Sequence, residues 1–129
     1  MLDRKRIKTT IDRLFTQLKI HAPNPGAAVR TLSGGNAQRV VLAKWLATNP
    51  KVLLLNGPTV GVDVGSKAQI LDLLRAQAAL GMGVVVISDD APELVACCHR
   101  VLVVAHGRLV NELTGEQVSV EAIQESMAA

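Results

Sequence analysis

Apolar residues recur every three or four positions over residues 3–19. They are Ile7, Ile11, Leu14, Phe15 and Leu18. This spacing places them on one face of a helix, so the segment is predicted to form an amphipathic helix. Residues 21–26 hold two prolines and a glycine, which cannot continue helical hydrogen bonding. A loop is therefore expected after the first helix.

A second helical pattern runs from about residue 33 to residue 48, and Pro50 marks its end. Its apolar positions, which we expect on or near the buried side, are Val40, Val41, Ala43, Trp45 and Leu46. Trp45 is expected to fill the core because it sits within this apolar pattern.

Short apolar runs at residues 52–55 and 84–87 are bounded by turn residues, which predicts two buried strands. The helix expected between them, at residues 66–80, has crossover length and favours a parallel pair. The remaining predicted elements are a helix at 90–98 that carries Leu94 and Val95 inward, strands at 101–104 and 109–112 around a His106-Gly107 turn, and a helix at 119–127. The order of these elements predicts an α/β fold.

Composition limits the chain to one modest domain, since 129 residues with 49% hydrophobic and 19% charged side chains suit a single packed core. The net charge of +3 comes from basic and acidic residues spread along the sequence, which argues against a nucleic-acid partner. Cys97 and Cys98 are adjacent, and no other cysteine could form a structural disulfide, so the cytosol is the expected compartment.

Two further classes are disfavoured. No apolar run reaches the length of a membrane span, so any membrane association is expected to come through a partner. The three histidines, His21, His99 and His106, share no metal-ligand spacing with the cysteines, and no metal site is predicted.

The segment Leu32-Ser33-Gly34-Gly35-Asn36 carries the clearest chemical signal. Its glycines let the backbone approach a ligand closely, and the helix that begins there directs unpaired N–H groups and the positive end of its dipole outward. Such an end attracts phosphate. Taken alone, however, Ser-Gly-Gly before a helix is more often an ordinary cap and loop.

The context of this segment changes that interpretation. An apolar strand follows it, then Pro58-Thr59-Val60-Gly61-Val62-Asp63, and then a second strand that ends in Ser88-Asp89-Asp90. This succession resembles ATP-binding-cassette (ABC) ATPases. The individual residues of the motifs resemble the second cassette of ribose-type sugar importers. The family's signature motif is matched by Leu32-Ser33-Gly34-Gly35. The resemblance implies a partial P-loop (RecA-like) core with a mostly parallel sheet, at residues 49–129, and a helical subdomain that carries the signature motif, at residues 1–48.

In that family two cassettes bind ATP between them, head to tail, and the resemblance implies the same for this chain. The residues expected to contact a shared ATP are Ser33, Gly34, Gly35, Asn36, Gln38 and Asp63. The expected partners are a second cassette and a membrane permease, which would hold the chain peripherally at the cytoplasmic side of the inner membrane. A homodimer is a further expectation, because half a cassette leaves an open apolar sheet edge or face.

The sequence also departs from the family. None of its ten glycines is followed by lysine, so a Walker A loop is absent from these residues. Asn56 and Gly57 stand where the family has Asp-Glu, which weakens magnesium binding and removes the usual base. No catalytic residue is therefore predicted. Asp89 lies at the family's switch position, but Asp89 and Asp90 are expected to cap the next helix.

These observations favour the ATP-binding subunit of a bacterial sugar importer, deficient in hydrolysis, that contributes its signature motif to a partner's ATP site. Whether the chain acts as an enzyme is left open by the sequence. The alternative is a non-catalytic interaction module, or relic of such an ATPase, in which the signature helix serves only in packing.

Overall fold

The computed structural model describes residues 3–129. The helices are α1 (Arg4–Gln17), α2 (Gly34–Leu46), α3 (Val64–Ala79), α4 (Ala91–Cys97) and α5 (Val120–Ala128). The strands are β1 (Val52–Asn56), β2 (Gly83–Ile87), β3 (Arg100–Ala105) and β4 (Arg108–Thr114). Every helix and strand predicted from the sequence is present. Two short 3₁₀ turns, η1 (Val29–Thr31) and η2 (Gly115–Gln117), were not predicted.

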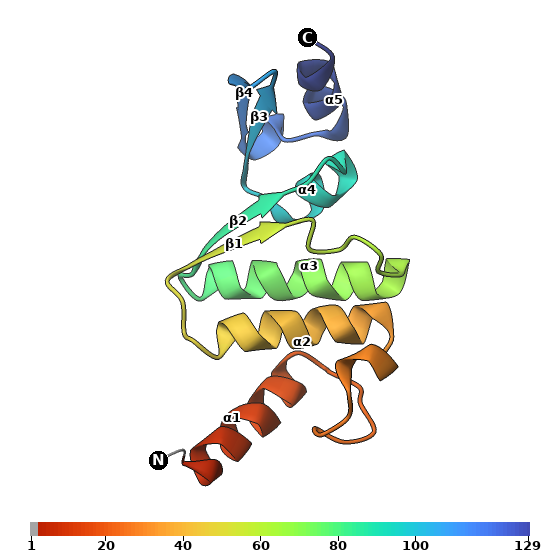
Figure 1. The fold of residues 1–129 in the computed structure, drawn as a ribbon. Helices are drawn as coiled ribbons and strands as arrows, with labels where there is room; N and C mark the ends of the chain where they lie inside the picture. The colour runs from red at the N-terminus through yellow and green to blue at the C-terminus, as the bar shows by residue number, and fades with distance from the viewer. Residues whose placement is uncertain (1–2) are drawn as a thin grey trace.

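The central part of the molecule is layered (Figure 1). β1 and β2 pair in parallel, with Val52 opposite Gly83 and Asn56 opposite Ile87, and α3 forms the crossover between them. α3 lies against the sheet, and α2 lies along the other side of α3. α1 and the C-terminal hairpin with α5 lie at opposite ends of the molecule. No helix between residues 3 and 129 is both long and apolar enough to cross a bilayer.

Each α-helix begins with a side-chain cap from an Asp or a Ser. The capping residues are Asp3, Ser33, Asp63, Asp90 and Ser119, and each accepts a hydrogen bond from a backbone N–H in the first turn. Such a cap satisfies one of the donors that a helix leaves unpaired at its start. The predicted capping role of Asp90 is confirmed, whereas Asp89 is exposed and caps nothing.

Two apolar clusters hold the chain together. The first joins α1, α2, β1 and α3, and its fully buried members include Leu42 and Ile70. The second lies between α4, the β3–β4 hairpin and α5, with Ile123 at its centre. Val86 of β2 packs against both clusters, so the parallel sheet connects them. The subdomain boundary at residue 48 stays a prediction.

The face that α2 buries differs from the prediction. Its buried positions are Gly35, Arg39, Leu42, Ala43 and Leu46. Trp45 is 51% exposed and Val41 is 44% exposed, so the expectation that Trp45 fills the core was wrong. Val41 and Trp45 are four residues apart and share the opposite helix face, where Lys44 lies 5.5 Å from the Trp45 ring. α4 shows the same error on a smaller scale, because Leu94 is buried but Val95 is 37% exposed.

The predicted buried strands are buried on one face only. Leu53 packs toward the helices, but Val52, Leu54, Val85 and Ile87 are exposed. The parallel register places these four side chains on one side of the sheet. The expected open apolar face is therefore present in the structure.

The hairpin forms its own sheet. β3 and β4 pair antiparallel and are not joined to β1 and β2 within residues 3–129. His106 and Gly107 both have positive φ angles, of 50° and 73°, which suit the tight turn predicted for these two residues.

Candidate functional site

Ser33 occupies the N-cap of α2 and is exposed to solvent. Its Oγ accepts hydrogen bonds from the backbone N–H of Asn36, at 3.3 Å, and from the Asn36 side chain Nδ2, at 3.1 Å. The amides of Gly34 and Gly35 belong to the first turn, where the helix itself offers no acceptor. The positive end of the helix dipole coincides with these amides. This end of α2 has the chemistry needed to bind an anion.

The two glycines have a packing role that the sequence analysis did not anticipate. A Cβ atom on Gly34 would lie 2.9 Å from the carbonyl oxygen of Gly61. A Cβ atom on Gly35 would lie 2.6 Å from the Cβ of Ser66. Gly34 is exposed, whereas Gly35 is buried. The glycines therefore allow the start of α2 to pack directly against residues 61–66.

This packing brings Asp63 to the signature segment. Asp63 is exposed, caps α3 by accepting the Ser66 N–H at 2.9 Å, and has a carboxylate beside Gly35. The hydrogen bonds from Ser66 hold the pKa of Asp63 below its usual range, so the carboxylate carries its charge at neutral pH. Gln38 lies one turn further along α2 and is half-buried. The structure therefore places Asp63 next to the cap of α2.

The end of β1 has a different character. Asn56 is exposed, and the Gly57 N–H donates to the carbonyl of Ile87 at 2.9 Å. Gly57 has a φ angle of +58°, and a Cβ atom there would lie 2.9 Å from Cγ2 of Val60. A glutamate at this position would be strained in the present backbone. Within residues 3–129, no group of three His, Cys, Asp or Glu side chains is placed to hold a metal ion.

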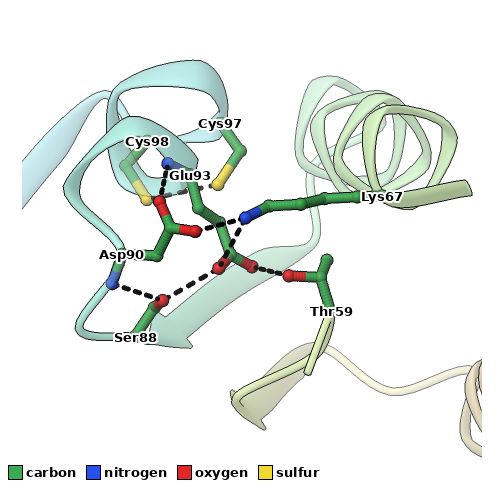
Figure 2. Close-up of polar contacts among 7 residues, drawn as sticks. All are labelled: Thr59, Lys67, Ser88, Asp90, Glu93, Cys97 and Cys98. Carbon is green, nitrogen blue, oxygen red and sulfur yellow. Dashed lines mark hydrogen bonds and ion pairs between the residues drawn. The ribbon is translucent and has the colours of Figure 1, made fainter. Parts of the chain in front are cut away.

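A polar cluster behind these loops was missed by the sequence analysis (Figure 2). Glu93 is 3% exposed and accepts hydrogen bonds from Thr59 Oγ1 and Ser88 Oγ, both at 2.8 Å. Lys67 on α3 pairs with Asp90 and lies 4.0 Å from Glu93. The cluster ties the loop after β1, the end of β2, α3 and α4 to one another. The only sequence signal was that Glu93 stands three residues after the Asp90 cap. A carboxylate at that position usually hydrogen-bonds to the start of its own helix, so it does not indicate contacts with distant residues.

The ion pair in this cluster perturbs both of its members. The hydrogen bond from Lys67 lowers the pKa of Asp90, and the same bond raises the pKa of Lys67. Cys97 and Cys98 lie beside the cluster with their sulfurs 3.6 Å apart. The hydrogen bond between the two sulfurs raises the pKa of Cys97 and lowers that of Cys98.

Known proteins share both the sequence and the fold. The family model described as "ABC transporter" matches residues 3–60. The ribose import ATP-binding protein RbsA 2 of Streptomyces coelicolor is 45% identical over 123 residues, which cover 95% of this chain and 24% of that protein. The chain thus spans about a quarter of the length of the curated relatives it matches.

Solved ATP-binding cassettes have the same arrangement. An ATP-binding cassette of an ABC transporter superposes with a TM-score of 0.81 at 20% identity, covering 99% of this chain and 49% of that one. A second cassette, solved as a dimer in a post-hydrolysis state with ADP and phosphate, superposes with a TM-score of 0.76 at 23% identity, over 88% of this chain and 49% of that chain. These likenesses show the fold.

The order of the motifs, the packing of the signature helix on the loop that ends at Asp63, and the agreement with these relatives lead to one assignment. Residues 3–60 match the ABC transporter family, and the chain has the fold of about half of an ATP-binding cassette.

Proposed function

We propose that this chain supplies the signature face of an ATP site in a bacterial sugar importer. In this proposal, Ser33 and the amides of Gly34 and Gly35 contact the terminal phosphate of ATP. The Walker A loop that holds the other phosphates lies outside these 129 residues. Asn36, Gln38 and Asp63 border the same contact surface.

The observation that carries the proposal is the geometry at the start of α2. An exposed serine hydroxyl, first-turn amides without an intrahelical acceptor and a helix N-terminus coincide there. The fit to ATP is one-sided, because none of these groups reproduces the lysine and amide cradle of a complete phosphate site. The name of the Streptomyces coelicolor relative, a ribose importer subunit, supports a sugar importer as the setting.

The proposal also assigns this chain no hydrolytic role of its own. Asn56 brings no charge to a magnesium ion, which prefers carboxylate oxygen. Gly57 brings no side chain to polarise water, and a positioned general base contributes roughly 10²- to 10⁴-fold in rate. The residues that are present therefore fit phosphate recognition better than metal-assisted hydrolysis.

The proposed partners are a cassette with a Walker A loop and a membrane permease, and the proposed location is the cytoplasmic side of the inner membrane. The solved cassette dimer supports a two-cassette arrangement. The exposed apolar face of β1 and β2, which comprises Val52, Leu54, Val85 and Ile87, offers a second contact surface for a further part of a cassette or for a second copy.

The test is equilibrium binding of a slowly hydrolysed ATP analogue to three samples. They are this chain, a cassette that has its Walker A loop but lacks its signature motif, and the mixture of the two. We expect tighter saturable binding in the mixture than in either component. Binding that is no tighter in the mixture would favour the alternative, a non-catalytic interaction module in which the signature helix serves only in packing.

A matched pair of variants locates the effect. Ser33→Ala and Ser119→Ala both remove a serine N-cap, which costs about 1 kcal/mol of stability in each case. Only Ser33→Ala is expected to weaken analogue binding in the mixture, by about tenfold, because a hydrogen bond to a charged acceptor contributes about 1.5 kcal/mol or more. Equal binding by the two variants would remove Ser33 from the site.

A further inference from the structure

The orientation of the Asn36 carboxamide is fixed by its neighbours. Its Oδ1 accepts a hydrogen bond from the His21 backbone N–H at 2.8 Å and one from Nη1 of Arg39 at 3.3 Å. A backbone amide and a guanidinium can only donate, so the oxygen of Asn36 must face them. The Nδ2 group is then forced toward Ser33, where it donates to Oγ at 3.1 Å.

This orientation determines what the Ser33 hydroxyl can do. A hydroxyl offers two acceptor sites and one donor. Asn36 occupies both acceptor sites of Ser33 Oγ, one through its backbone N–H and one through Nδ2. Within residues 3–129, the Ser33 hydroxyl donates to no protein acceptor, and Ser33 is exposed. The hydroxyl hydrogen is therefore free for an acceptor that arrives from outside.

Arg39, which donates a hydrogen bond to Asn36 Oδ1, is itself held by other parts of the chain. Its side chain is buried, with 5% of the residue exposed, and it makes no salt bridge among residues 3–129. The guanidinium donates to Oε1 of Gln69 on α3 and, at 3.5 Å, to the carbonyl of Lys19 after α1. Arg39 is thus held by α3 and by the turn after α1, and it contacts Asn36 within its own helix.

We infer that Arg39 is a positioning residue that acts through Asn36 to preset the Ser33 hydroxyl as a hydrogen-bond donor to a terminal phosphate. The inference rests on the proposed function for its ligand. It adds residues that no motif comparison assigned to the site, namely Arg39, Gln69 and the backbone of His21.

The test is a double-mutant cycle in the mixture of this chain with a Walker A cassette, using the slowly hydrolysed ATP analogue as the probe. Gln69→Leu removes the acceptor that anchors Arg39 at a position whose own side chain is exposed. We expect Gln69→Leu to weaken binding about threefold, and to have no effect when Ser33 is already alanine. Gln69→Glu retains an acceptor for Arg39 and is expected to bind like the wild type.

Asn36→Asp provides the stronger perturbation. An ionised aspartate cannot donate, so the Ser33 hydroxyl must turn inward to it. We expect about tenfold weaker binding with Ser33 present and a clearly smaller loss in the Ser33→Ala background, where only the added charge acts. Losses that are equal in the two backgrounds for both Asn36→Asp and Gln69→Leu would overturn the inference.

These outcomes are distinguishable from failure of the proposed function. If the wild-type chain does not increase analogue binding in the mixture, the proposed function fails, and the inference fails with it. If the wild type does so but the cycles are additive, only the inference fails. A measurement on the free chain keeps the test independent of folding losses: the side-chain amide protons of Asn36 should exchange slowly with solvent in the wild type and faster in Gln69→Leu, and equal exchange would contradict the inference.

Discussion

The start of α2 and the end of β1 both carry residues that match family motifs, but they differ in the chemical groups that they offer. At α2, Ser33 and Gly34 are exposed, and the groups that could bind phosphate remain. At β1, Asn56 and Gly57 offer no carboxylate, and the backbone at Gly57 has a positive φ that suits glycine. The proposed function therefore separates phosphate recognition from hydrolysis.

The two junctions are nevertheless linked by a series of contacts. Residues 61–66 pack against the signature glycines. The next residue, Lys67, pairs with Asp90 and lies near Glu93. Glu93 in turn accepts hydrogen bonds from the hydroxyls of Thr59 and Ser88. These contacts join the two junctions through the first turn of α3. The predictions below separate packing, backbone conformation and charge at these places.

The largest effect is expected at Gly35. Gly35→Ala introduces a Cβ atom 2.6 Å from that of Ser66, so α2 and α3 must move apart. We expect a loss of about 2 to 3 kcal/mol in the free energy of unfolding, measured in urea. Gly65→Ala is the matched control, since its Cβ meets only Asp63 Oδ1 at 3.5 Å in the first turn of α3. A stability of Gly35→Ala equal to that of Gly65→Ala would show that the glycines are not required for packing.

A smaller effect is expected at the end of β1. Restoring the family's acidic pair with Asn56→Asp and Gly57→Glu places a side chain at a φ of +58°, which costs about 1 to 2 kcal/mol. Gly57→Ala should lose a similar amount, whereas Asn56→Asp alone should change little because Asn56 is exposed. Urea unfolding of the three variants distinguishes backbone strain from charge. A double variant as stable as the wild type would show that Gly57 is not conformationally required.

The smallest effect concerns the Lys67–Asp90 pair, whose side chains are 27% and 39% exposed. The pKa of Asp90 is lowered and that of Lys67 is raised, so the pair stabilises the fold between these two values. Its contribution is lost as the pH falls through the lowered pKa of Asp90 or rises through the raised pKa of Lys67. We expect Lys67→Met to cost at most about 1 kcal/mol at pH 7, because both groups are partly solvated, and to cost less at pH 3.

Urea unfolding at the two pH values measures this difference. Lys8→Met is the control, because the Lys8–Asp12 pair has side chains that are 80% and 54% exposed. It should change stability by a few tenths of a kcal/mol at most. A cost of Lys67→Met that does not depend on pH would assign the effect to packing of the lysine side chain and not to its charge.

The sequence was sufficient for the helices and strands because their boundaries are marked by local signals. Asp90 caps the helix that follows, as predicted, and the Pro50 break and the His106-Gly107 turn mark further boundaries. The Asp63 cap was not predicted, and the helix expected from residue 66 begins at Val64. The candidate site residues on α2 came from the family resemblance, because glycines beside a capping serine are by themselves more often an ordinary cap, and their binding role stays a prediction.

Long-range choices were not predictable in the same way. On α2, the apolar run 40–43 followed by Trp45 and Leu46 is compatible with more than one buried face, and the choice depends on where α1 and α3 lie. Glu93 and Arg39 are also buried by contacts with distant elements, through Thr59 in one case and Gln69 in the other. Polar residues of this kind are identified only when the tertiary packing is known.

The central claim is that the first turn of α2 binds phosphate and the end of β1 does not. The most direct measurement follows the backbone amide resonances of the labelled chain when the slowly hydrolysed ATP analogue is added in the presence of the unlabelled Walker A cassette. We predict analogue-dependent shifts at Gly34 and Gly35 and none at Gly57. Unchanged resonances at Gly34 and Gly35 under saturating analogue would contradict the account.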